Sequence, residues 1–265
     1  MNIEKWGSFS LSSGEETDFY VLGDLRLWLK HKDEEIWIGH RYEEQGDGES
    51  NTGNFSETPP QDLEWARWAP KDPTDSVKLM PVFPDLPLVI NSEFPLRVNP
   101  GGSIQIFTRI PVWVRISIGK KDTVLTELPA LKLSRTWFGT PIEGELCYWA
   151  ITKARRSLSN VERKPYLVSC PIQITNKTDE DLDFEKFCFR VERLKVFSYA
   201  EELWSDETRI VYHGEEQHSD ISMSGRLPKG MENARLISPP RKPVQRSLAT
   251  RTFKKLFDES FLFGK

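Results

Sequence analysis

The sequence predicts a mainly β protein: an antiparallel β-sandwich of immunoglobulin-like or jelly-roll-like type, with an N-terminal β-hairpin region and a C-terminal amphipathic helix. Three observations favour this class. Many short runs alternate apolar and polar residues and are separated by turn residues, which is typical of sandwiches and barrels. Helical periodicity is almost absent ahead of the tail. Nine Trp and fifteen Phe among 265 residues suit the broad faces of sheets.

Residues 1–75 form the predicted N-terminal β region, either on its own or as part of the same sheet system. The run 24–30 places three Leu on one face of a strand and Arg, Trp and Lys on the other, and 36–40 supplies a second strand for an antiparallel hairpin. Residues 43–60 are rich in Gly, Ser, Asn and Glu, so we expect an acidic loop. At 63–68, two Trp lie three residues apart, a spacing that predicts a short helical turn with both rings on one face. Such a turn would either cover the open end of a sheet or form an aromatic platform for a ligand.

Residues 76–225 form the predicted sandwich. Asn99–Gly102 reads Asn-Pro-Gly-Gly and predicts a turn. Alternating residues follow from 103 to 118, and Pro111 divides them at an edge, a bulge or a crossing between sheets. Further strand patterns lie at 168–174, 182–199, 208–213 and 221–224.

The stretch 135–150 combines two Trp, a Phe and a Tyr with two Gly and one Pro. It predicts an aromatic strand, a tight turn carrying Glu143 and Glu145, and a second strand that packs in the core. Paired carboxylates can serve as general acid and nucleophile in glycoside cleavage, so this pair is a candidate catalytic site. Two solvated glutamates at a turn are the alternative.

The segment 213–220 offers a second candidate site. His213, His218 and Asp220 suit a divalent metal, although their spacing matches no metal motif, and a solvated hairpin loop is the alternative. The sequence contains no glycine-rich phosphate loop, no nucleophile elbow and no Cys-x-x-Cys pair. We therefore expect no cofactor.

Charge and cysteine usage indicate compartment and partners. The net charge is −4, but residues 226–265 hold ten Lys or Arg against three Asp or Glu, so the tail is +7 and the remainder −11. An acidic body disfavours general nucleic-acid binding. Three cysteines without close spacing favour reduced, buried thiols. With no secretory signal at the start and no apolar run long enough to span a bilayer, we expect a cytoplasmic protein.

Residues 226–265 form the predicted basic tail, in which a proline-containing spacer at 238–243 precedes a helix near 248–261. An apolar stripe with lysines beside it suits a groove on a protein partner, and docking on the protein's own body is the alternative. The predicted partner-binding residues are Phe253, Leu256, Phe257, Phe261, Lys254 and Lys255.

Three segments carry a resemblance to a known family: Trp137–Tyr148, Pro171–Asn176 and Phe187–Val191. With them the sequence resembles the prokaryotic domain-of-unknown-function family DUF432, from about the first hairpin to Met223. The family has no established catalytic motif, so the resemblance implies no residue role. It implies an accessory role beside a mechanosensitive membrane channel.

The predicted function is that of a non-enzymatic cytoplasmic binding protein whose basic C-terminal helix contacts a protein partner. One alternative is a hydrolase that uses Glu143 and Glu145, or a metal near His213 and His218. The other is a structural subunit that forms homo-oligomers through its sheet edges.

Overall fold

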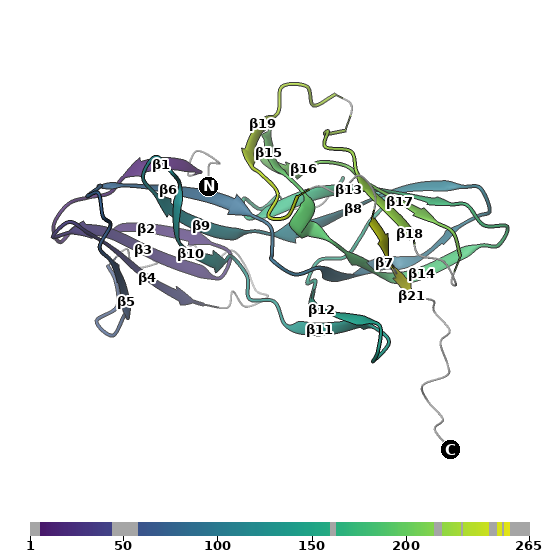
Figure 1. Ribbon diagram of the computed structural model, residues 1–265, viewed down its shortest axis with the longest axis horizontal. Coiled ribbons are helices and arrows are strands. Elements are labelled where there is room, and N and C mark those ends of the chain that lie inside the picture. Colours follow the sequence, from purple (N-terminus) through teal and green to yellow (C-terminus); the bar gives the residue numbers. More distant parts are fainter. Residues whose placement is uncertain are drawn as a thin grey trace, which may run out of the picture. The chain divides into compact units, whose positions relative to one another are not determined.

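The computed structural model describes residues 6–43, 58–159, 163–214, 219–228, 230–243, 248–250 and 252–254. Over these residues the protein is mainly β, as predicted, with twenty-one strands, a 3₁₀ turn at Val191–Arg193 and no α-helix (Figure 1). Accordingly, the described residues contain no helix with the length and apolar character needed to cross a membrane.

The chain divides into two compact units, each built from two β-sheets. The first unit comprises Met1–Val82 and Val112–Lys132, and the second comprises Phe83–Pro111 and Leu133–Lys265. Each unit therefore joins two segments that are distant in the sequence.

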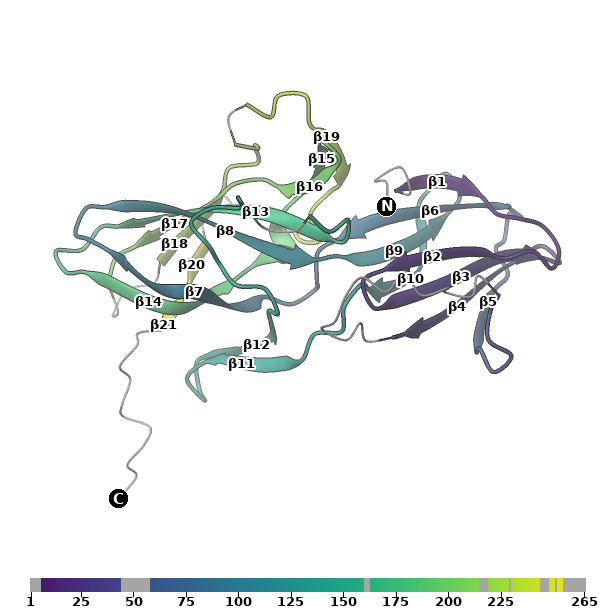
Figure 2. The ribbon, with the colours of Figure 1, turned by 180° about the vertical axis from the view of Figure 1, so that it is seen from behind.

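In the first unit, two antiparallel four-stranded sheets face each other (Figure 2). One sheet has the order β1-β6-β9-β10, with β1 at Gly7–Ser10, β6 at Ser76–Val82, β9 at Trp113–Ile118 and β10 at Thr123–Pro129. The other has the order β2-β3-β4-β5, with β2 at Asp18–Leu22, β3 at Leu25–Lys32, β4 at Glu35–Tyr42 and β5 at Trp65–Trp68. The rings of Phe9 on β1 and Tyr20 on β2, 6.2 Å apart, connect the sheets.

The predicted N-terminal hairpin is confirmed as β3 and β4, which pair along their whole length. Leu25, Leu27 and Leu29 are completely buried, as their alternation predicts. Trp28 and Lys30, on the opposite face of β3, are also buried. β3 is therefore covered on both faces.

The second unit contains the predominantly antiparallel sheet β11-β12-β7-β14-β21 and a larger mixed sheet around β13. The strands of the first sheet are β7 (Leu88–Val98), β11 (Arg135–Gly139), β12 (Gly144–Trp149), β14 (Leu182–Phe189) and β21 (Phe253–Lys254). Those of the second are β8 (Ser103–Pro111), β13 (Leu167–Asn176), β15 (Val196–Tyr199), β16 (Glu202–Ser205), β17 (Thr208–Tyr212), β18 (Ser219–Met223), β19 (Arg235–Ser238) and β20 (Leu248–Thr250). β13 pairs antiparallel with β8 and parallel with β16 and β17, so the purely antiparallel prediction is too simple.

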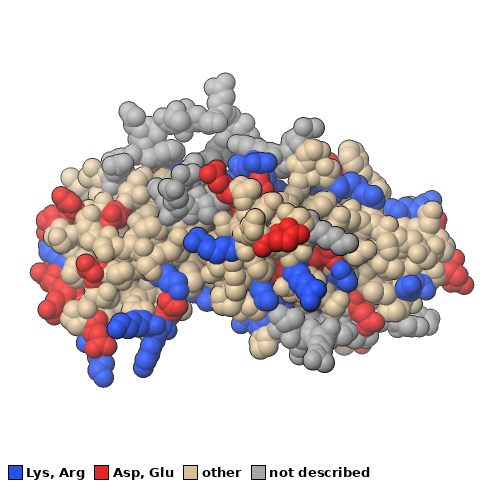
Figure 3. Space-filling view, turned by 90° about the horizontal axis from the view of Figure 1, so that it is seen from above, with Lys and Arg blue, Asp and Glu red and all other residues tan. Residues whose placement is uncertain are grey.

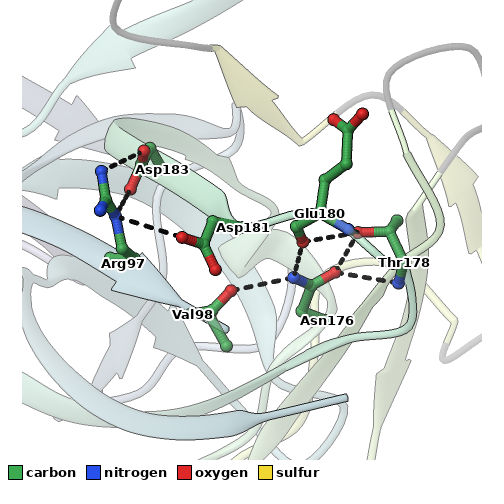
Figure 4. A network of polar contacts seen from close by, with 7 residues as sticks. All are labelled: Arg97, Val98, Asn176, Thr178, Glu180, Asp181 and Asp183. Carbon is green, nitrogen blue, oxygen red and sulfur yellow. Dashed lines mark hydrogen bonds and ion pairs between the residues drawn. The ribbon is translucent and has the colours of Figure 1, made fainter. Parts of the chain in front are cut away.

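One end of this unit is fixed by Asn176, the last residue of β13 (Figure 4). Its amide nitrogen donates to the carbonyl oxygens of Val98 (2.9 Å) and Glu180 (2.7 Å). Its side-chain oxygen accepts hydrogen bonds from the backbone N–H and the hydroxyl of Thr178. The buried amide thus has all its donors and acceptors occupied, and it ties the end of β13 to β7 and to the following loop.

The predicted C-terminal helix is wrong for the residues that the structure describes. Leu248–Thr250 and Phe253–Lys254 form β20 and β21, which pair with β18 and β14. The edges of β18 and β14 offer unpaired backbone groups, and pairing with them outweighs the helical spacing of the apolar residues. Residues 255–265, where most of the predicted stripe falls, lie outside the described residues.

Candidate functional site

The hairpin formed by β11 and β12 lies at the edge of its sheet (Figure 1). Its two strands pair from Arg135 opposite Tyr148 to Gly139 opposite Gly144. The ring of Trp137 lies against Gly144, where an added Cβ would come within 2.2 Å of the indole nitrogen. That nitrogen donates to the carbonyl oxygen of Thr140 (2.9 Å), so the tip folds back on the Trp ring.

This hairpin and the residues that follow it expose an unusual amount of apolar surface. The exposed fractions are 52% for Trp137, 94% for Ile142, 43% for Leu146, 37% for Trp149 and 61% for Ile151. Trp137 and Leu146 are opposite each other in the register and share one face, whereas Trp149 lies on the other face of β12, near the base of the hairpin. Exposed apolar residues gathered in one place mark interaction sites more often than scattered ones do.

The base of the hairpin is anchored on its other face. Phe138 and Cys147 form a buried cluster with Val89 of β7 and Cys188 of β14. Backbone pairing between β12 and β7 covers only Tyr148 and Trp149. The Tyr148 hydroxyl also donates to a carboxylate oxygen of Asp85 (3.0 Å). The hairpin is therefore fixed at one end, whereas its tip extends past the start of β7.

The structure places the predicted catalytic glutamates in different surroundings. Glu143 is exposed in the turn, where its backbone N–H bonds to the hydroxyl of Thr140 (2.9 Å). Glu145 lies on β12 and forms a close ion pair with Arg190. The sequence analysis missed Arg190, which is 45 positions from Glu145, because no local pattern joins them.

The predicted metal residues are only partly described. His213 Nε2 and Asp220 Oδ2 lie 3.0 Å apart, whereas His218 falls outside the described residues. In the part of the chain that the structure describes, no group of three or more His, Cys, Asp or Glu could hold a metal ion. The metal site stays a prediction.

Of the six predicted partner-binding residues of the tail, the structure describes two, Phe253 and Lys254. Phe253 packs between Phe184 (4.9 Å between ring centroids) and Tyr212 (5.7 Å), within the second unit. Lys254 pairs in register with Lys186. The other four predicted residues, Leu256, Phe257, Phe261 and Lys255, are outside the described residues.

The proline-containing spacer docks on the second unit as well. Lys242 donates its backbone N–H to the carbonyl of Glu192 (2.9 Å), and its Nζ lies 3.6 Å from a carboxylate oxygen of the same residue. Arg193 donates to the carbonyl of Pro243 (2.7 Å), and Arg241 donates to the carbonyl of Phe83. The basic spacer thus binds the protein's own body at these positions.

A second aromatic cluster lies on the outer face of β3, β4 and β5 in the first unit. The segment predicted as a helical turn is a strand, because Trp65–Trp68 pairs with the edge of β4. Lys30 Nζ lies 4.6 Å from the ring centroid of Trp37 and 4.8 Å from that of Trp65. Arg67 lies over Trp37 at 4.5 Å. These rings are occupied by the protein's own cations, which disfavours a ligand platform here.

Charge does not single out another docking region on the face drawn in Figure 3. Basic and acidic residues are interspersed there among the other residues. Charge on this face therefore offers no alternative to the exposed apolar hairpin as a docking region.

Comparison with models of known protein families identifies a family. The model of the family described as "Protein of unknown function (DUF432)" matches residues 5–258. No curated protein and no solved structure matches the chain.

Proposed function

The chain belongs to the DUF432 family, which matches nearly its whole length, and we propose that it is a non-catalytic binding protein that docks on a protein partner through the β11–β12 hairpin. The observation that carries this proposal is the set of large apolar side chains exposed between residues 137 and 151. Interfaces concentrate their binding energy in a few such anchors, with aromatic residues prominent among them.

The polar groups of the hairpin support a protein partner rather than a polar small molecule. The indole N–H of Trp137 is already bonded within the turn, and the carboxylate of Glu145 is paired with Arg190. The tip presents the apolar ring of Trp137 and the almost fully exposed Ile142, beside the exposed carboxylate of Glu143. Such a tip suits an apolar groove with a polar rim.

The same ion pair supports a non-catalytic role. In glycoside cleavage one carboxylate attacks the sugar and the other donates a proton, so both must face the substrate. Glu145 instead lies against Arg190, and Glu143 is a turn residue. We place the docking in the cytoplasm because the three cysteines are free, as expected in a reducing compartment. A membrane-channel subunit is one partner that the family resemblance implies.

Site-specific photocross-linking tests the proposal. A benzoylphenylalanine at position 142, expressed in cells that carry the native partner, should form a discrete adduct, whereas the same probe at Phe94 should not. Phe94 is a matched control, since it is 71% exposed and lies in the same unit but away from the hairpin. Replacing Trp137 by Ala should remove the adduct at position 142.

The identity of the adduct separates the alternatives. A second protein supports the proposal, while a second copy of this chain supports the homo-oligomeric subunit. An absent adduct, or adducts of equal yield at positions 142 and 94, contradicts docking through the hairpin.

A further inference from the structure

Two thiols meet beneath the hairpin. The Sγ atoms of Cys147 on β12 and Cys188 on β14 are 3.8 Å apart, and both residues are completely buried. Cys147 lies one position before the pairing of β12 with β7 begins, so its side chain reaches past the start of β7 towards β14. The third cysteine, Cys170, is buried on β13, in the other sheet of the unit.

The thiol pair is closed off by the ion pair described above. The Cys188 thiol donates to a carboxylate oxygen of Glu145 (3.7 Å), and Arg190 holds that carboxylate in place. The hydrogen bond with Cys147 and the burial of the sulfur raise the pKa of Cys188 well above its usual value, whereas Arg190 acts in the opposite direction. In the closed hairpin the Cys188 thiol therefore retains its proton, and a protonated thiol reacts slowly with disulfides.

The hairpin has a weak attachment that can expose the pair. Two residues of β12 pair with β7, the backbone N–H of Ala150 just after β12 donates to the carbonyl oxygen of Val89 (2.9 Å), and residues 144–147 of β12 lie beyond this attachment, with β11 as the edge strand. Segments with few backbone pairs open locally at a lower free energy than the core does. An opened hairpin would bring Cys147 and Cys188 into contact with solvent.

We propose that Cys147 and Cys188 are a modification site, at which a low-molecular-weight disulfide such as oxidised glutathione converts the two thiols into an intramolecular disulfide. The thiolate of one cysteine attacks the reagent, forms a mixed disulfide and releases one glutathione thiolate, which takes up a proton. While the hairpin is still open, the second cysteine loses its proton to solvent, attacks the mixed disulfide as a thiolate and releases the second glutathione as a thiolate, which takes up a proton. Two protein thiols are oxidised and one glutathione disulfide is reduced.

The product changes how the hairpin is held. A bond between residues 41 positions apart would join β12 to β14 across the start of β7. The hairpin would then no longer open independently of the sheet. This inference depends on the thiol geometry and stands whether or not the hairpin docks on a partner.

Linkage mapping of the full-length chain tests the site. The purified protein is incubated with oxidised glutathione, the remaining thiols are alkylated in denaturant, and the peptides are identified by mass spectrometry. We expect a peptide pair joined through Cys147 and Cys188, with Cys170 alkylated. In the oxidised protein the amides of Leu146–Tyr148 should exchange with solvent at least about tenfold more slowly than in the reduced protein.

Two variants sharpen the mapping. Cys170→Ala should leave the linkage unchanged, and Cys147→Ala should stop at a mixed disulfide on Cys188. If all three cysteines of the wild-type chain stay alkylatable, or if Cys170 enters the linkage as often as Cys147, the proposal is wrong. The linkage found in the wild-type chain tests the proposal even if one of the variants fails to fold.

Discussion

Tryptophans lie on sheet faces in both units, but their surroundings differ. In the first unit, Lys30 and Arg67 cover the rings of Trp37 and Trp65, and Glu35 accepts hydrogen bonds from Arg67 (2.8 Å) and from the indole of Trp37 (3.0 Å). In the second unit, Trp137 bonds only to its own turn among the contacts described above, and half of its surface is exposed.

The difference separates an aromatic cluster that stabilises the fold from one that is available for binding. A ring covered by a cation of its own chain gains attraction from that cation and offers little surface to others. A ring left open costs free energy in water, and exposed apolar side chains that lie together mark binding surfaces. Exposure and cation contacts, rather than tryptophan content, distinguish the two regions.

The largest expected effect contrasts a buried tryptophan with the open one. Trp28 is buried and stacks on Phe19 (5.0 Å between ring centroids), so Trp28→Ala should lower the free energy of unfolding by about 3–5 kcal/mol. Trp137→Ala should lower it by less than about 1 kcal/mol, because its ring is already half exposed. Urea unfolding followed by circular dichroism measures both. Equal losses would show that Trp137 belongs to the core and would remove the basis for docking.

The next effect concerns the cation between the two covered rings. Lys30→Met keeps the length of the side chain but removes its charge, and should cost about 1–2 kcal/mol because the ammonium group is buried between Trp37 and Trp65. Lys30→Arg keeps the charge and serves as the matched control. Thermal unfolding of the three proteins measures the effect. An unchanged midpoint for Lys30→Met would mean that packing alone closes this face.

The pH dependence of the hairpin follows from the raised pKa of Cys188. In the opened hairpin this thiol ionises from about pH 8.5 upwards, whereas the closed hairpin retains the proton. The contribution of Cys188 to closure is therefore complete below about pH 8.5, and above that value it falls by at most about 1.4 kcal/mol per pH unit. Hydrogen exchange of Leu146–Tyr148, corrected for base catalysis, should reveal the loss.

Two comparisons control this experiment. Cys188→Ala should remove the pH dependence, and the amides of β3 and β4 should show none between about pH 8 and pH 9.5. Equal acceleration in both units would assign the effect to general destabilisation rather than to the thiol.

Local pattern was enough to predict much of the fold. The alternation at 24–30 and 36–40 predicts β3 and β4, and Asn99–Gly102 does form a turn, with Gly101 at φ 68° and a hydrogen bond from Gly102 N–H to Asn99 O. These elements depend on the alternation of side chains between the two faces of a strand and on the backbone conformations open to glycine. Both are determined by residues that are close together in the sequence.

What could not be predicted depends on distant strands. The tail residue Phe253 fits a helical spacing, but the free edge of β14 decides its conformation. The exposure of Trp137 depends on where β7 begins, and the contact of Cys147 with Cys188 depends on the order of three strands. The spacing of residues in the sequence predicts none of these three features. The aromatic composition of residues 135–150 does mark this stretch as a candidate site.

The smallest expected effect tests whether coverage alone distinguishes the two regions. Arg67 is largely exposed, so Arg67→Gln should cost only about 0.5–1 kcal/mol through the lost contacts with Trp37 and Glu35. The ring of Trp37 would then face solvent on one side, and the full-length variant should bind more of an apolar fluorescent dye than the wild type does. Arg67→Lys retains a cation near the ring and should bind less dye. If Arg67→Gln binds no more dye than the wild type, the cations are not what keeps the Trp rings of the first unit from binding apolar molecules. The exposure of Trp137 must then be explained by its position on a hairpin with no neighbouring strand.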